Sequence, residues 1–212
     1  MRSGRARESR RGLCAALTCA AAFYAPHVSA DECTEQAMIV FDGSGSMAEM
    51  GFNKIDVPRI LEARSAVARA MPEIATQRLI GLLIYGPNGP DGCTGNDLRF
   101  APIPDAAQQV IHAVNGLEPA GETPLTASVS EAVKVLEARA GSGLVVLVTD
   151  GKETCGGSPC QLAAQLAGGA YTVHVIGFKV RGEYFAFSND DGNEYDNAAY
   201  VAWCLAGRTG GV

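Results

Sequence analysis

Residues 37–46 have the sequence Ala-Met-Ile-Val-Phe-Asp-Gly-Ser-Gly-Ser, in which an apolar run leads into a loop of glycine and serine. The apolar part, residues 37–41, is too short for a helix and is rich in strand-forming residues. Because its apolar residues are consecutive rather than alternating, both faces of the strand are expected to be buried, as in a parallel sheet covered by helices. The stretch therefore predicts a buried strand that runs into the loop starting at Asp42.

The same arrangement recurs along the chain. Similar apolar runs occupy residues 79–85, 144–149 and 171–177. Helical spacing of apolar residues is found at residues 58–72, 104–114, 123–141 and 196–206. Ser158-Pro159-Cys160-Gln161 has the form of a capping box at the start of another helix. This alternation predicts an α/β fold, a doubly wound, mostly parallel sheet with helices on both faces. We also expect one short antiparallel edge strand at residues 98–100, and Trp203 in the core.

Length and charge exclude several classes of protein. A chain of 212 residues with 47% hydrophobic and 19% charged residues suits one folded domain and does not have the composition of a disordered chain. Five of the 17 basic residues but only one of the 23 acidic residues lie in residues 1–30, which leaves residues 31–212 with a net charge of −10. Such an acidic body is a poor partner for nucleic acids or anionic membranes, so neither is expected as a ligand.

Residues 1–30 have the layout of a secretory signal peptide. Arginines, including the pair Arg10-Arg11, precede an apolar run, and Val28-Ser29-Ala30 places small residues where a signal peptidase cleaves. The run is shorter than the roughly 20 residues that a membrane span needs. We therefore expect export to the periplasm or the extracellular space, by the general or the twin-arginine route, and a mature protein of residues 31–212 without a membrane span.

Five cysteines follow residue 30: Cys33, Cys93, Cys155, Cys160 and Cys204. In an oxidising compartment most of them are expected to pair, and the odd number leaves one thiol free or paired between chains. The sequence between Cys155 and Cys160 contains two glycines and a proline, which favour a tight turn, so a Cys155–Cys160 disulfide is predicted. Cys33 and Cys204 are a further candidate pair.

Oxygen-bearing side chains gather at three predicted strand or helix ends. They are Asp42, Ser44 and Ser46 after the first strand, Thr123 before the 123–141 helix, and Asp150 after the 144–149 strand. Ligands of open α/β sheets bind beyond the carboxyl ends of the strands, so these side chains are expected to meet. A helix N-cap is the simpler explanation for any one of them, but it does not explain oxygens on three loops. Two carboxylates and three hydroxyls suit Mg²⁺ or Mn²⁺ rather than zinc.

These motifs closely resemble those of von Willebrand factor A (VWA) domains. The matching motifs are Asp42-x-Ser44-x-Ser46, the Gly-x-Thr-Pro-Leu loop around Thr123, and the strand that runs into Thr149-Asp150-Gly151. The resemblance implies a metal-ion-dependent adhesion site, with Asp42, Ser44, Ser46 and Thr123 as metal ligands and Asp150 bound directly or through water. Residues 152–155 and 159–160 are similar to a bacterial secreted subgroup of VWA proteins.

The resemblance implies a binding module rather than an enzyme. The metal ion of such a domain captures a carboxylate, so a protein partner that offers an acidic residue is expected. Two alternatives stay open, which are a VWA subunit of an ATPase- or chelatase-type assembly and a metal-activated hydrolase. Members of the family continue past a Thr-Gly-Gly motif with a last strand and a last helix, so the domain expected at residues 31–212 lacks these two elements or is truncated at Val212.

Overall fold

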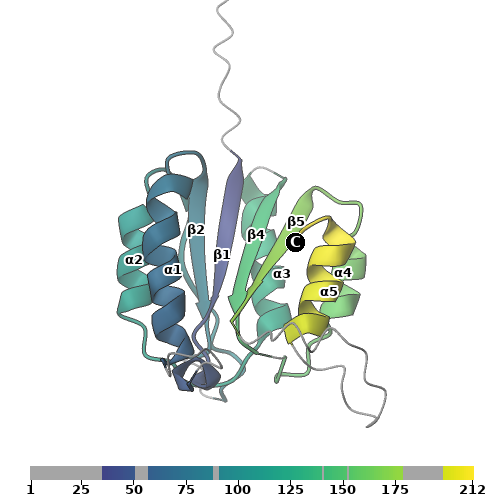
Figure 1. Ribbon diagram of the computed structural model, residues 1–212. Helices are drawn as coiled ribbons and strands as arrows, with labels where there is room; N and C mark the ends of the chain where they lie inside the picture. The colour runs from purple at the N-terminus through teal and green to yellow at the C-terminus, as the bar shows by residue number, and fades with distance from the viewer. Residues whose placement is uncertain (1–34, 51–56, 88–90, 140, 152, 179–197) are drawn as a thin grey trace, which may run out of the picture. The chain divides into compact units, whose positions relative to one another are not determined.

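The strand that contains residues 37–41 lies in the middle of the sheet in the computed structural model (Figure 1). The structure describes residues 35–50, 57–87, 91–139, 141–151, 153–178 and 198–212. These all belong to one compact unit, which spans residues 33–212. The predicted signal peptide and Cys33 lie outside the described residues.

Five strands form the sheet in the order β3-β2-β1-β4-β5. They are β1 (Gln36–Asp42), β2 (Leu79–Tyr85), β3 (Asp97–Ile103), β4 (Gly143–Thr149) and β5 (Tyr171–Gly177). β1 pairs in parallel with β2 and β4, and β4 pairs in parallel with β5, whereas β3 runs antiparallel to β2 at the edge. The predicted mostly parallel sheet with one antiparallel edge strand is confirmed, and the edge strand is longer than expected.

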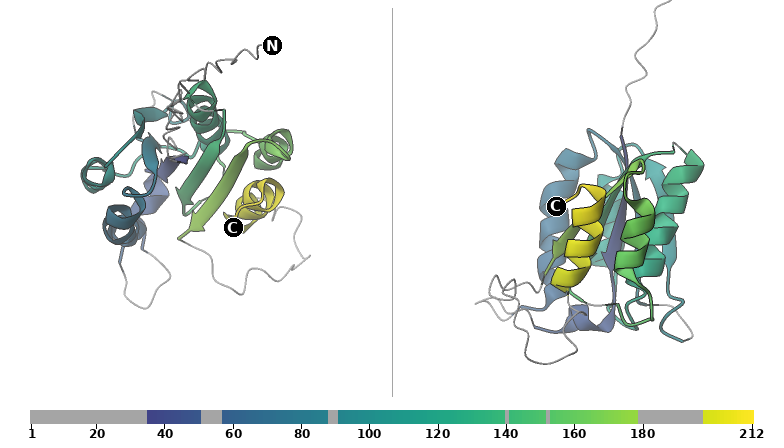
Figure 2. Two further views of the ribbon diagram at one scale, coloured as in Figure 1. Left: turned by 90° about the horizontal axis from the view of Figure 1, so that it is seen from above. Right: turned by 90° about the vertical axis from the view of Figure 1, so that its right-hand side faces the viewer.

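Helices cover both sides of this sheet (Figure 2). They are α1 (Arg59–Ile74), α2 (Ala107–Asn115), α3 (Leu125–Arg139), α4 (Pro159–Leu166), α5 (Ala198–Thr209) and the short 3-10 helix η1 (Gly45–Ala48). Successive residues of β1 point to opposite faces. Ala37, Ile39 and Phe41 pack in the cluster that contains α1 and α2, whereas Met38 and Val40 pack in the cluster of α3, α4 and α5. Burial on both faces explains why this stretch is apolar at every position.

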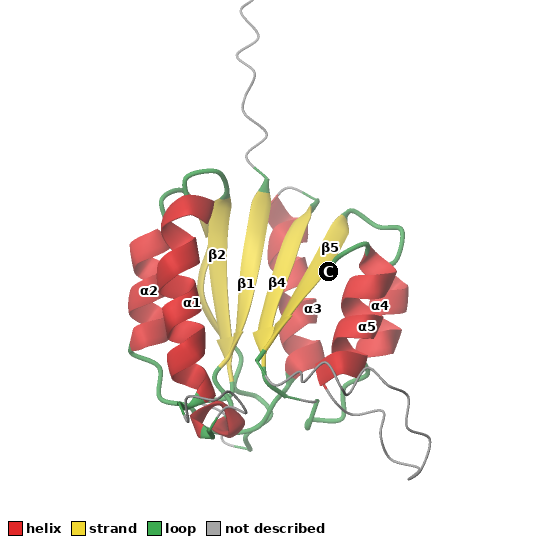
Figure 3. Ribbon diagram, in the orientation of Figure 1, coloured by secondary structure: helices red, strands yellow, loops and turns green. Residues whose placement is uncertain are grey.

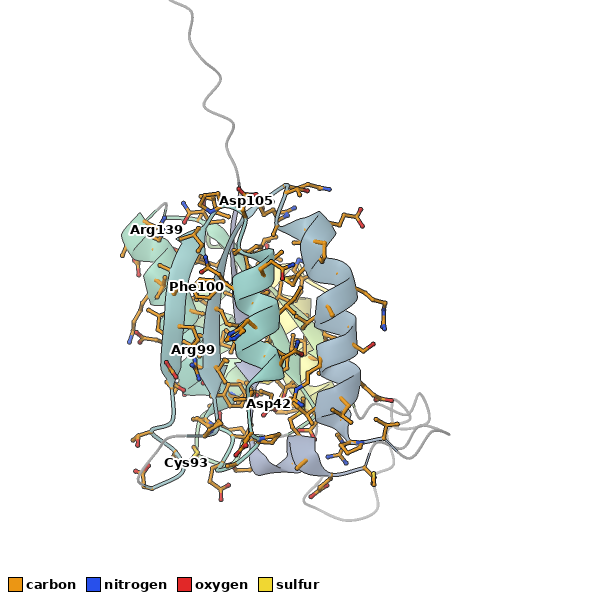
Figure 4. The ribbon with its side chains drawn as sticks, turned by 90° about the vertical axis from the view of Figure 1, so that its left-hand side faces the viewer. Asp42, Cys93, Arg99, Phe100, Asp105 and Arg139 are labelled. Atoms are coloured by element: carbon orange, nitrogen blue, oxygen red, sulfur yellow. A yellow bond between two sulfur atoms is a disulfide. The ribbon has the colours of Figure 1, made fainter. Side chains whose placement is uncertain are left out.

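The carboxyl ends of β1, β2 and β4 meet at one end of the sheet because the three strands are parallel. The loops that leave β1 and β4 and the loop that enters α3 gather there (Figure 3). Asp42 and Cys93 lie at this end, away from Asp105 and Arg139 (Figure 4). This is the end at which the sequence predicts the site.

The described cysteines pair differently from the prediction. Cys93 is bonded to Cys155, with 5.5 Å between the two Cα atoms, and Cys160 is bonded to Cys204, with 4.8 Å between Cα atoms. The predicted Cys155–Cys160 disulfide is therefore wrong, and Cys204 is not available to Cys33. The physical reason is that Cys160 lies on α4 and packs in the core cluster with Cys204 of α5, whereas Cys155 lies in the preceding loop.

Two further expectations are wrong in detail. Ser158 precedes α4, as predicted, but its side chain makes no capping hydrogen bond; only backbone bonds, from Gln161 N–H and Leu162 N–H to the Ser158 carbonyl, close this turn. Trp203 is 64% exposed on α5, where its ring stacks on Tyr200, so it is not a core residue. Among the described residues, no helix is both long and apolar enough to cross a membrane.

Candidate metal centre

The loop after β1 and the loop before α3 are joined by backbone hydrogen bonds. Gly45 N–H donates to the Gly121 carbonyl at 3.1 Å, and Ala120 N–H donates to the Gly43 carbonyl at 2.9 Å. Gly121 has a φ of +74°, and a Cβ atom there would lie only 2.1 Å from the Gly86 carbonyl oxygen, so no other residue fits. These contacts bring Thr123 to the same end of the sheet as Asp42.

Four predicted site residues form a continuous row of oxygen atoms. The Ser44 hydroxyl donates to Asp42 Oδ1 at 2.5 Å, the Ser44 and Ser46 hydroxyls lie 3.2 Å apart, and the Ser46 hydroxyl donates to Asp150 Oδ1 at 2.7 Å. We call these atoms the oxygen row. Asp42, Ser44 and Asp150 are buried and Ser46 is half-buried. The structure thus brings together residues that are about a hundred positions apart in sequence.

Thr123, the fifth predicted residue, lies beside this row. A Cβ atom on Gly151 would lie 3.7 Å from the Ser46 hydroxyl and 3.9 Å from the Thr123 hydroxyl, so both hydroxyls border the same space. Within the described part of the chain the Thr123 hydroxyl makes no hydrogen bond. The first turn of α3 uses another group, since Thr126 N–H donates to Glu153 Oε2 at 2.7 Å. Glu153 therefore makes the capping hydrogen bond at this helix start, and the Thr123 hydroxyl does not.

Burial places an energetic cost on the negative charge of the site. The pKa of Asp42 is raised, first by desolvation and also by the nearby negative charge of Asp150, although hydrogen bonds from Ser44 and Thr149 oppose the rise. The Thr149 hydroxyl donates to Asp42 Oδ2 at 2.6 Å, and the Tyr85 hydroxyl donates to Thr149 at 3.1 Å. Two carboxylates held in a buried site favour a cation beside them.

Several groups that build the site were not singled out from the sequence. Arg59, 2% exposed, donates from Nη1 to Asp150 Oδ2 at 2.5 Å and to the Ser46 carbonyl at 2.9 Å. Thr149 belongs to the Thr-Asp-Gly motif, and its place before Asp150 was the one signal that could have suggested a role. An arginine next to a proline at a helix start looks the same in sequence whether it is buried or solvated.

Hydrogen bonds join the segment after Asp150 to the loop of Thr123. Thr123 N–H donates to the Thr154 hydroxyl at 2.8 Å, and Thr154 N–H donates back to the Thr123 carbonyl at 3.2 Å. Glu153 binds both Thr126 N–H and Cys155 N–H with its two carboxylate oxygens. We call residues 153–155 the clamp segment. It fixes the Thr123 loop to the Asp150 loop.

The donor atoms fit a small divalent cation. Oxygens that surround Mg²⁺ octahedrally at about 2.1 Å lie roughly 3 Å from one another. The three separations along the oxygen row, 2.5, 3.2 and 2.7 Å, lie around that value. Carboxylates and hydroxyls are also the ligand types that Mg²⁺ and Mn²⁺ prefer. The assignment of Asp42, Ser44, Ser46, Thr123 and Asp150 as ligands remains a prediction that this geometry accommodates.

Two curated proteins of Bacillus subtilis (strain 168) are similar in sequence to this chain. The uncharacterized protein YwmC is 28% identical over 172 residues, which cover 74% of this chain and 74% of YwmC. The uncharacterized protein YwmD is 31% identical over 150 residues, which cover 66% of each chain.

Solved structures share the fold at low sequence identity. The VWA domain of SpRpn10 has a TM-score of 0.52 at 15% identity, covering 74% of this chain and 84% of that one. A von Willebrand factor type A protein from Catenulispora acidiphila has a TM-score of 0.55 at 17% identity, covering 84% and 38%. The pilus adhesin SpaC of Lactobacillus rhamnosus GG has a TM-score of 0.54 at 15% identity, covering 80% and 26%.

The family model of the von Willebrand factor type A domain matches residues 38–200, which is well over half of the chain. This range begins in β1 and includes all three loops that form the site. Domains of this family typically mediate protein interaction or adhesion. The chain belongs to the von Willebrand factor type A domain family.

Proposed function

We propose that the protein is an exported binding module that captures a protein partner through a divalent cation, Mg²⁺ or Mn²⁺. The observation that carries the proposal is the oxygen row from Asp42 to Asp150, which the loops after β1 and β4 build at the carboxyl end of the sheet. The proposal requires no catalysis.

Some residues of the site supply charge, and others supply neutral oxygens or orient the carboxylates. Asp42 and Asp150 supply negative charge, whereas Ser44, Ser46 and Thr123 supply neutral oxygens. The Ser44 N–H and hydroxyl hold Asp42 Oδ1, and the Thr149 hydroxyl holds Asp42 Oδ2, so the carboxylate is oriented before anything binds. A divalent cation held by these residues would supply a positive charge to which a partner's carboxylate could bind.

A partner carboxylate also agrees with the charge of the whole body. Residues 31–212 carry a net charge of −10, so an acidic partner is repelled from most of the surface. A local cation removes that repulsion at one place only. The acidic body therefore adds specificity, because a carboxylate that does not reach the cation is only repelled.

Two observations support export over an intracellular assembly subunit. The four described cysteines form two disulfides, and disulfides persist mainly in oxidising compartments. Residues 1–30 have the layout of a signal peptide. The pilus adhesin SpaC shares the fold, and adhesion outside the cell is the role that we propose here as well.

The proposal is tested with protein purified from the exported fraction, whose intact mass is expected to begin at Asp31. Mg²⁺ titration calorimetry should show one binding site in the wild type and none in Asp42→Ala. Partners cross-linked in Mg²⁺ should disappear with chelator and in Asp42→Ala, and should be retained by the control Glu118→Gln, which removes an exposed acidic residue near the Thr123 loop. Equal Mg²⁺ binding by wild type and Asp42→Ala would refute the metal centre.

A further inference from the structure

Arg59 places a permanent positive charge against the candidate metal centre. Its side chain is 2% exposed, and Nη1 lies 2.5 Å from Asp150 Oδ2. It is the first residue of α1, the end of a helix at which the backbone dipole disfavours a cation. The contact with Asp150 must therefore outweigh both this dipole and the desolvation of the guanidinium.

The guanidinium and the oxygen row use different atoms of the same two residues. Arg59 contacts Asp150 through Oδ2 and Ser46 through the backbone carbonyl. The row uses Asp150 Oδ1 and the Ser46 hydroxyl. Arg59 thus lies beside the row rather than in it, and it leaves Asp150 with a single oxygen, Oδ1, directed to the other ligand candidates.

The charges of these groups can be counted. Among the described residues, the buried charged side chains at the site are Asp42 and Asp150, which contribute −2, and Arg59, which contributes +1, so together they carry −1. Glu49 also contacts Arg59, at 3.2 Å, but its side chain is 64% exposed and its charge is screened by water. Addition of a divalent cation brings the centre to +1, whereas without Arg59 the same cation would bring it to zero.

We propose that Arg59 is an internal counter-ion that determines which ligand the centre accepts: it weakens divalent-cation binding and leaves the occupied centre with a positive charge that only an anionic ligand neutralises. The inference rests on the proposed function, because it assumes that the oxygen row holds the cation. It makes Arg59 a specificity-determining residue, which acts through Asp150 and through its own charge rather than by touching the partner.

The test uses Mn²⁺ as the metal and acetate as the carboxylate probe, with the full exported protein. Mn²⁺ affinity is measured by electron paramagnetic resonance, and acetate binding by the loss of relaxation enhancement when a Mn²⁺-bound water is displaced. Arg59→Gln is expected to bind Mn²⁺ about tenfold more tightly and acetate about tenfold more weakly than the wild type, since a unit charge at close range is removed. Arg59→Lys, which keeps the charge, should resemble the wild type in both.

The matched control is Arg99→Gln, which breaks an Arg–Asp ion pair with Asp97 on the edge strand β3 and should change neither affinity. Arg59→Met serves if Arg59→Gln does not fold, because it also removes the positive charge and keeps an unbranched side chain in the buried position. It should bind Mn²⁺ about tenfold more tightly than the wild type. Unchanged Mn²⁺ affinity in a folded Arg59→Met protein would overturn the inference.

The outcomes separate this inference from the function on which it rests. Mn²⁺ binding by the wild type with the same Mn²⁺ and acetate affinities in Arg59→Gln would overturn the counter-ion role and leave the metal centre in place. Absence of Mn²⁺ binding in both wild type and Arg99→Gln would refute the metal centre itself. Binding by Arg59→Gln but not by the wild type would show that the guanidinium replaces the cation, and would overturn both.

Discussion

Asp42 carries a charge in a place where an isolated charge is unfavourable. It is completely buried, and burial is the largest cause of its raised pKa. Hydrogen bonds from Ser44 and Thr149 stabilise the carboxylate only in part, since the net effect is still a rise of the pKa. The residue therefore favours cation binding at a cost to the stability of the protein without the cation.

Asp42→Asn should change stability in opposite directions with and without metal. Because folding raises the pKa of Asp42, the folded protein keeps the Asp42 proton up to a higher pH than the unfolded chain does, so the free energy of unfolding falls as the pH rises above about 4. In chelator at pH 7, Asp42→Asn should therefore be more stable than the wild type. In Mg²⁺ only the wild type should gain stability. Urea unfolding from pH 4 to 8 measures both, and a variant less stable than the wild type in chelator would contradict this account.

Thr123→Ala should remove metal binding and leave the fold nearly unchanged. Since Glu153 already binds the Thr126 N–H, loss of the Thr123 hydroxyl should cost less than about 1 kcal/mol of unfolding free energy. Mg²⁺ binding in calorimetry should be lost in Thr123→Ala and retained in Thr123→Ser, which keeps the hydroxyl. A Thr123→Ala protein that binds Mg²⁺ normally would show that Thr123 is not a ligand.

At the scale of elements, the site depends on how loops are fastened rather than on the strands alone. Gly92, next to Cys93, accepts the Glu122 N–H at 3.3 Å, so the loop that carries Cys93 lies against the Thr123 loop. The Cys93–Cys155 bond then joins it to the clamp segment. This disulfide covalently joins the Cys93 loop, which lies against the Thr123 loop, to the segment that follows Asp150.

Removal of the Cys93–Cys155 disulfide should weaken both the fold and the metal centre. A bond between residues 62 positions apart stabilises by about 4 kcal/mol through chain entropy. Cys93→Ala/Cys155→Ala should lose up to that amount of unfolding free energy, and its Mg²⁺ affinity should fall about threefold or more because the Thr123 loop must be ordered on binding.

Cys160→Ala/Cys204→Ala is the matched control for that experiment. The Cys160–Cys204 bond joins residues 44 positions apart, so its removal should cost a similar amount of unfolding free energy. This bond joins α4 to α5, however, and not the site loops. Its Mg²⁺ affinity should equal that of the wild type. Equal affinity in both double variants would show that the site loops do not depend on the Cys93–Cys155 bond.

At the scale of the whole molecule, hydrophobic pattern was sufficient to predict the architecture. The apolar runs at residues 37–41 and 79–85 became strands within one residue of their predicted ends, because burial on both faces leaves no position for a polar residue. The helix at residues 104–114 was displaced, and α2 begins at Ala107, since a weak apolar stripe does not determine a helix start.

Contacts between distant segments could not be predicted in the same way. The Cys155–Cys160 prediction considered only local separation, whereas the observed disulfides join cysteines 62 and 44 positions apart in sequence. The oxygens of the site were predicted because each occupies a strand or helix end. Arg59 was not, because its role depends on a carboxylate 91 positions away.

The bond between Cys160 and Cys204 has a consequence for the movement of α5. It fastens α5 to α4, while the Thr209 hydroxyl of α5 accepts a hydrogen bond from Val173 N–H of β5. Proteins that switch affinity by sliding a helix need that helix to take up a second position along the sheet. The bond to α4 opposes such sliding of α5 for as long as it stays intact. Oxidation of these two thiols therefore fixes α5 against α4.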